Sequence, residues 1–125
     1  MSQITRIYSV TGTTSGTGQT IGAVTANILT LNLGAVPTVF IVEAKVVGFD
    51  PLGPAGIVYN LLCGVRTTGI ASAIIKLQDI YTAEEASLAA CDARFVTAGN
   101  TLIVQVTGAA GRTINWVAST TTIGV

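Results

Sequence analysis

Apolar residues recur at every second position along almost the whole chain, and this period constrains the fold more than any other feature. Successive side chains of a β-strand point to opposite faces of a sheet, so the alternation predicts half-buried strands. The helical period of 3.6 residues is nearly absent. Segments with the two-residue period lie within residues 4–10, 28–33, 40–46, 57–66, 74–81, 89–95, 102–107 and 114–118.

Turn-forming residues separate these segments. The longest turn is Asp50 to Gly56 (DPLGPAG), in which two prolines restrict φ. A spacing of about 10–15 residues between strands is typical of a sandwich or a jelly roll. We therefore predict an all-β fold, an antiparallel, jelly-roll-like β-sandwich of about eight strands.

The chain length of 125 residues fits a single domain. We expect this β-sandwich domain to occupy residues 21–125, after an N-terminal strand and a flexible arm in residues 1–20. The arm is predicted because Thr11 to Thr20 is rich in Gly, Thr and Ser. One helix is conceivable, at Ala83 to Ala90, but a turn at Thr82 to Glu85 followed by a strand is the favoured interpretation.

The low charge of the chain argues against nucleic acid as a partner and favours association with other protein subunits. Only 10% of the residues are charged and the net charge is zero, so the chain lacks the basic surface that nucleic acid binding needs. No membrane span is expected, because the longest apolar stretch, Ala35 to Phe49, is short and contains Pro37, Glu43 and Lys45. Zero net charge together with many apolar residues predicts a homo-oligomer or a part of a larger assembly.

Two segments, 39–47 and 57–65, are apolar on both alternating faces. A sandwich strand usually buries one face and exposes the other to water. The second apolar face of these strands is therefore predicted to contact another subunit. The predicted interface residues are Ile41, Val47, Val58 and Leu62.

The sequence lacks the residues of common catalytic sites, so we expect no enzyme activity and no cofactor. There is no histidine, which removes the usual general base and the commonest metal ligand. Cys63 and Cys91 match no metal-binding spacing. They are interpreted as small buried hydrophobic residues, with a disulfide as the alternative. The adjacent Glu84 and Glu85 are interpreted as solvated charges, and no calcium-binding pattern is present.

Aromatic residues offer few candidates for ligand contact. Trp116 and Tyr59 could stack on a sugar, but both alternate with apolar residues, so packing in the core is favoured. Tyr8 and Tyr81 remain as the candidate aromatic contacts.

A resemblance to a known family rests mainly on the C-terminal third of the chain. The run Gly99 to Gly108 (GNTLIVQVTG), followed by Ala109 to Ala118 (AAGRTINWVA), combines a strand, a tight glycine turn and a strand containing tryptophan. With Thr38 to Ala44, Tyr59 to Leu61 and Thr82 to Glu85, this pattern resembles tailed-bacteriophage virion structural proteins with a jelly-roll-like β-sandwich. The resemblance covers about residues 38–125.

The resemblance implies a structural role in a virion assembled in the host cytoplasm, and a homotrimer. The main expectation is a capsid decoration (cement) protein that contacts the major capsid protein and stabilises the head shell. The alternative is a structural or host-recognition module of a tail, neck or appendage, which would bind carbohydrate. No fibrous segment precedes the sandwich in this sequence, which favours an accessory protein that stands alone.

Overall fold

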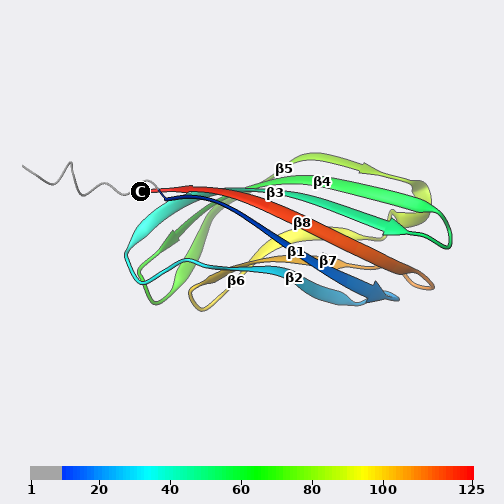
Figure 1. The fold of residues 1–125 in the computed structure, drawn as a ribbon, viewed down its shortest axis with the longest axis horizontal. Helices are drawn as coiled ribbons and strands as arrows, with labels where there is room; N and C mark the ends of the chain where they lie inside the picture. The colour runs from blue at the N-terminus through cyan, green and yellow to red at the C-terminus, as the bar shows by residue number, and fades with distance from the viewer. Residues whose placement is uncertain (1–9) are drawn as a thin grey trace, which may run out of the picture.

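The alternating side chains form eight antiparallel strands among residues 10–125, the part of the chain that the computed structural model describes (Figure 1). One short 3₁₀ helix interrupts them. In chain order the elements are β1 (Val10–Ile21), β2 (Thr25–Asn32), β3 (Thr38–Asp50), β4 (Ala55–Thr67), β5 (Ser72–Glu84), η2 (Ala86–Leu88), β6 (Asp92–Ala98), β7 (Thr101–Thr107) and β8 (Thr113–Gly124).

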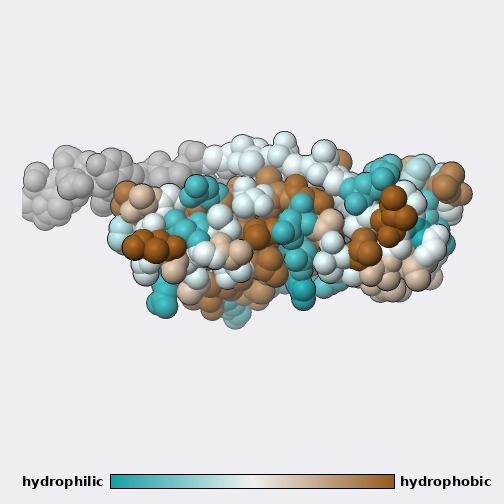
Figure 2. Space-filling model, turned by 90° about the horizontal axis from the view of Figure 1, so that it is seen from below, coloured by the Kyte–Doolittle hydropathy of each residue, from teal (hydrophilic) through white to brown (hydrophobic). Residues whose placement is uncertain are grey.

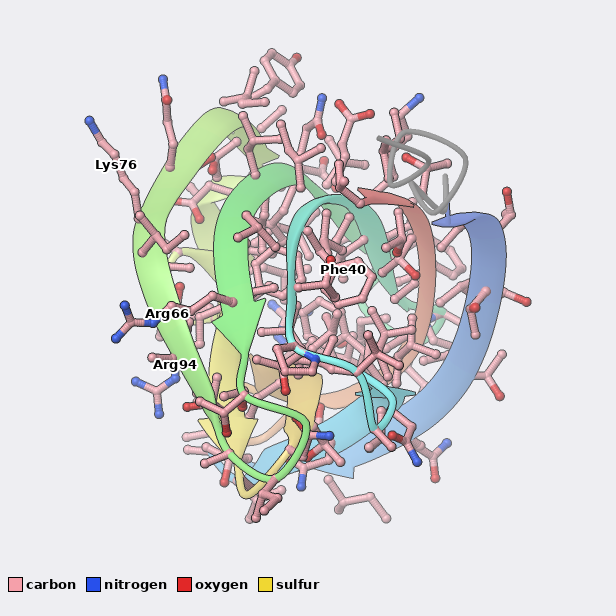
Figure 3. The ribbon with its side chains drawn as sticks, turned by 90° about the vertical axis from the view of Figure 1, so that its left-hand side faces the viewer. Phe40, Arg66, Lys76 and Arg94 are labelled. Atoms are coloured by element: carbon pink, nitrogen blue, oxygen red, sulfur yellow. The ribbon has the colours of Figure 1, made fainter. Side chains whose placement is uncertain are left out.

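The strands form two sheets. The larger has the order β1-β8-β3-β4-β5 and the smaller has the order β2-β7-β6. The larger sheet arches over the smaller one, with β5 and β1 on its two flanks (Figure 3). β1 pairs with β8, so the first and last of the described strands are neighbours in the larger sheet, and β2 pairs with β7 in the smaller sheet. The predicted all-β antiparallel sandwich of eight strands is confirmed.

The core lies between the sheets, and β3 and β4 supply much of it. Every second residue of these two strands is buried, which is the pattern expected when one face of a sheet covers a core. Burial of each large apolar side chain stabilises the fold by roughly 1.5–3 kcal/mol. Figure 3 shows Phe40 pointing between the sheets. The inward apolar residues of β3 and β4 are Phe40, Val42, Ala44, Val46, Ile57, Tyr59, Leu61, Cys63 and Val65.

Trp116 is the largest fully buried side chain, at 1% exposure. A Cβ atom on Gly48 would lie 2.6 Å from the Trp116 ring, so glycine at this position makes room for the indole. Tyr59 is also buried. The interpretation of Trp116 and Tyr59 as core residues is confirmed, and a sugar-stacking platform made from them is excluded.

The prediction of a flexible arm is wrong for the described part of residues 1–20. Residues 10–21 form β1, which pairs with β8 along its whole length. Its small residues permit close packing, because a Cβ atom on Gly18 would lie 2.6 Å from the Ile28 side chain of β2. Long-range pairing thus overrides the flexibility that the composition predicts. The strand predicted within residues 4–10 lies outside the described residues apart from Val10.

The predicted turn between β5 and the following strand lies slightly later than expected. β5 continues to Glu84, and η2 then buries Leu88 completely. β6 begins at Asp92 rather than near residue 89. The buried Leu88 therefore packs this connection against the core.

Candidate interaction surface

The four residues predicted to form a subunit interface all lie on the outer face of the larger sheet. Ile41 and Val47 of β3 are 48% and 49% exposed, between neighbours that point into the core. Val58 and Leu62 of β4 are half-buried and alternate with buried residues in the same way. The structure brings the four together on one face, and their role as an interface remains a prediction.

The registers of β8, β3 and β4 arrange the outward side chains of this face in rows that cross the three strands. We call these rows the outer strip. Its two end rows are apolar and its two middle rows carry the charges. In order, the rows are Ile123, Ile41 and Gly64; Thr121, Glu43 and Leu62; Ser119, Lys45 and Asn60; and Val117, Val47 and Val58.

Two further apolar residues of this strip, both on β8, are not among the four predicted interface residues. Val117 and Ile123 of β8 are both about half exposed and lie directly beside Val47 and Ile41. Their alternation signals an outward face, but only the pairing of β8 with β3 places them in the strip.

A shallow hollow lies at each end of the outer strip. The first has a volume of about 390 Å³ and its lining includes Ile41, Leu62 and Ile123. The second has a volume of about 490 Å³ and its lining includes Val47 and Val58. The strip therefore offers two apolar depressions separated by a charged middle, a shape that can receive side chains from a partner.

The outer face of the smaller sheet differs, because its polar groups are satisfied within the molecule. Arg94 of β6 donates to the Gln105 side chain of β7 at 2.9 Å, and Gln105 donates to Asn27 of β2 at 3.0 Å. This ladder crosses all three strands. In Figure 2, which views this face, hydrophilic residues lie across its middle among hydrophobic ones. Such a face needs no partner for its hydrogen bonds.

The free edge of β5 is poorly suited to pairing with another strand. Its pairing with β4 shifts register twice, leaving Ile75 and Ile80 without partners. Bulges and an edge lysine both discourage strand addition, and Lys76 supplies the lysine. Figure 3 shows Lys76, Arg66 and Arg94 pointing away from the sandwich on this side. The outer strip is therefore a better candidate for contact with a partner than the β5 edge.

The described carboxylates do not form a metal site. No group of three or more His, Cys, Asp or Glu side chains that could hold a metal is found among residues 10–125. Glu85 accepts a hydrogen bond from the Gly56 backbone N–H at 2.6 Å, and Asp79 accepts one from Thr82 at 2.6 Å. No helix in the described part of the chain has the length and apolarity to cross a membrane.

Asp50 and Arg112 form the one salt bridge among the described residues, at 3.0 Å. The Arg112 hydrogen bond holds the pKa of the Asp50 carboxyl below its ordinary value, although burial opposes this shift. Backbone N–H groups of Leu52 and Gly53 also donate to the carboxylate. The pair joins the β3–β4 turn to the start of β8 and stabilises the fold locally.

The two cysteines are free and buried. Burial raises the pKa of the Cys63 thiol to about 11, and it raises the pKa of Cys91 as well. This confirms their interpretation as small core residues and excludes the alternative of a disulfide between them in this structure. Thiols with raised pKa are poor nucleophiles at neutral pH.

The tyrosines differ in their environments. Burial raises the pKa of the Tyr59 hydroxyl, and Cys91 and Asp92 contribute to the shift. Tyr81 on β5 is 58% exposed and is available for contact. Tyr8 lies outside the described residues. Of the two candidate aromatic contacts, the structure therefore places one, Tyr81.

Comparisons with known proteins give no family. No protein-family model matches the sequence, and no curated protein matches it. The crystal structure of the Acinetobacter baumannii phage AM24 tailspike protein aligns with 90% of this chain at 8% identity and a TM-score of 0.46. The tailspike protein of Acinetobacter phage vB_ApiP_P1 aligns with 86% of the chain at 18% identity and a TM-score of 0.35.

This chain spans only part of those two proteins. The alignments cover 26% of the first tailspike chain and 20% of the second.

Proposed function

We propose that this chain is a structural subunit of a tailed-phage virion and that it assembles through the outer strip of its larger sheet. The observation that carries this proposal is the half exposure of the apolar side chains at both ends of the strip, such as Ile41, Val47 and Val117. Exposed apolar patches such as the two ends of this strip are often covered by a partner. The proposed role is mechanical and includes no catalytic step and no cofactor.

The residues that resemble phage virion proteins support this proposal by their position. Gly99 to Ala118 supplies β7, the central strand of the smaller sheet, and the first half of β8. β8 lies beside β3 in the larger sheet and contributes Val117 to the outer strip. The resembling segment therefore builds both layers of the sandwich and part of the proposed contact surface.

The proposed place in the virion is the head shell, where the chain would decorate the major capsid protein as a homo-oligomer. A second candidate is a host-recognition module of a tail or neck appendage. One observation favours it: a groove of about 210 Å³ whose lining includes Leu77, Asp79, Asp92 and Arg94. Charged groups beside apolar side chains can hydrogen-bond the hydroxyl groups of a sugar and pack against its ring. A glycan array tests this second candidate.

Sedimentation velocity tests the contact surface. Val58→Asp and Leu62→Asp each place a charge on the outer strip, so we expect the oligomer to dissociate. Ile70→Asp is the matched control, because Ile70 is 85% exposed in the turn between β4 and β5, away from the strip. Unchanged oligomeric mass in both strip variants would overturn the assignment.

Quantitative mass spectrometry of purified virions tests the place. A copy number comparable to that of the major capsid protein supports decoration of the shell. A small fraction of that number supports a tail or neck position and makes carbohydrate binding the next assay. Absence from the virion overturns the proposal as a whole.

A further inference from the structure

The outward residues of β3 have a nearly palindromic character. Two apolar residues, an acid, a base and two apolar residues follow one another along the strand, and the four apolar ones are all close to half exposed. The midpoint of the pattern is Ala44, which points into the core. The residues in order are Val39, Ile41, Glu43, Lys45, Val47 and Phe49.

We infer that two copies of this chain pack outer strip against outer strip, related by a two-fold axis that passes over Ala44 and runs across β3. This inference rests on the proposed function, since it specifies the partner of the surface proposed there. An isologous contact of this kind uses the same patch on both copies. The threefold arrangement implied by the phage resemblance would instead require two different patches on each copy.

On β3 and β8, the axis sets the outward residues of the strip against residues of suitable chemistry in the second copy. Rotation about it exchanges positions at equal distances on either side of Ala44. Ile41 therefore faces Val47 of the second copy, and Glu43 faces Lys45. On β8, the same rotation sets Ile123 against the second copy's Val117, because these residues lie in the same rows as Ile41 and Val47.

Charge complementarity supports a second copy as the partner. Neither Glu43 nor Lys45 forms an ion pair among the described residues, in which Arg112 and Asp50 make the only one. The two-fold contact would give each of them an opposite charge, twice per dimer. A partner with a uniformly apolar face would bury both charges unpaired, which is strongly unfavourable.

The arch and twist of the sheet limit the contact without disrupting its centre. Because β5 and β1 curve away on the flanks, contact is confined to β8, β3 and β4 (Figure 3). From Val39 to Phe49 across these three strands, the contact measures about 34 Å by about 14 Å, so each copy buries about 500 Å², at the small end of specific interfaces. When two aligned sheets pack, their strands cross at about 30°, so residues close to the axis are displaced least from their partners in the second copy. Glu43 and Lys45 are close to the axis.

Charge reversal tests the symmetry, with molecular mass measured by sedimentation equilibrium. Glu43→Lys and Lys45→Glu each create two like-charge pairs across the axis, so we expect each to weaken the dimer by at least about tenfold. The double variant E43K/K45E restores both opposite-charge pairs and should recover the dimer. An equimolar mixture of the two single variants should form a heterodimer, although each alone dissociates.

Two variants on the smaller sheet serve as matched controls. Asp92→Lys and Arg94→Glu make the same changes in net charge on β6, away from the strip, and should leave the dimer intact. Circular dichroism confirms that each variant is folded. A wild-type trimer or monomer, or a double variant that fails to recover the dimer, overturns the two-fold inference. If the wild type is an oligomer that Val58→Asp and Leu62→Asp still dissociate, the proposed surface stands and only its symmetry is wrong.

Discussion

The indole N–H of Trp116 donates a 2.9 Å hydrogen bond to the hydroxyl of Thr20, and both side chains are buried. Trp116 lies on β8 and Thr20 on β1. The bond therefore satisfies the one polar atom of the largest core residue and fixes the position of the edge strand β1. A buried donor without a partner is costly, so this pair has a measurable effect on stability.

Thr20→Val should lower the free energy of unfolding by about 1–3 kcal/mol. The substitution keeps the shape of the side chain but leaves the Trp116 N–H buried without an acceptor. Urea unfolding followed by tryptophan fluorescence measures the change. Thr20→Ser retains the hydroxyl and should lose less stability. Equal stability of wild type and the valine variant would show that the hydrogen bond is not important.

Gly48→Ala should destabilise the fold by roughly 1–3 kcal/mol, because the new methyl group would overlap the Trp116 ring and Ile57. Gly12→Ala in β1 is the control, since its Cβ atom would meet no atom within 4 Å. Thermal unfolding of the two variants compares them. A Gly48→Ala melting temperature equal to that of Gly12→Ala would contradict the close approach of the indole.

Stability should depend on pH through Asp50. Its pKa is lower in the folded protein than the ordinary value of 3.8, so the folded state favours the carboxylate. The resulting stabilisation is complete above pH 3.8 and is lost as the pH falls through the folded-state pKa. Asp50→Asn should therefore be less stable than wild type at pH 7, with the difference shrinking below pH 4. A difference that stays constant with pH would count against the Arg112 pair as its source.

Both cysteine thiols should resist modification until the protein unfolds. With a pKa of about 11, roughly one Cys63 side chain in a thousand is a thiolate at pH 8. Cys91 is also buried and its pKa is also raised. Titration with Ellman's reagent should detect almost no reaction in buffer and two thiols per chain in denaturant. Rapid reaction of one thiol in buffer would place that residue at the surface.

The sequence predicts which side chains of the central strands point into the core. It does not predict which other strands lie beside them. Alternation alone separates Val42 and Val46 from Ile41 and Val47, because burial follows the two-residue period of a strand. It does not show that Ile123 lies beside Ile41, since that contact depends on pairing between opposite ends of the chain.

The glycine- and threonine-rich strand β1 illustrates the same limit. Its local composition favours a flexible segment, yet β8 provides hydrogen-bond partners along its length. Gly16 and Gly18 also allow Ile28 of β2 to approach closely. The sequence of β1 alone predicts neither its pairing with β8 nor its contact with Ile28. Local preferences therefore failed where distant strands decide the structure.

The antiparallel pairing of β1 with β8 also determines how the protein would respond to mechanical load. Val10 is paired with Gly124, so the two strand ends leave the sandwich side by side. Tension applied between them would open the β1–β8 ladder one pair at a time, like a zipper, instead of shearing all its hydrogen bonds together. Single-molecule pulling at these two positions should therefore meet low resistance.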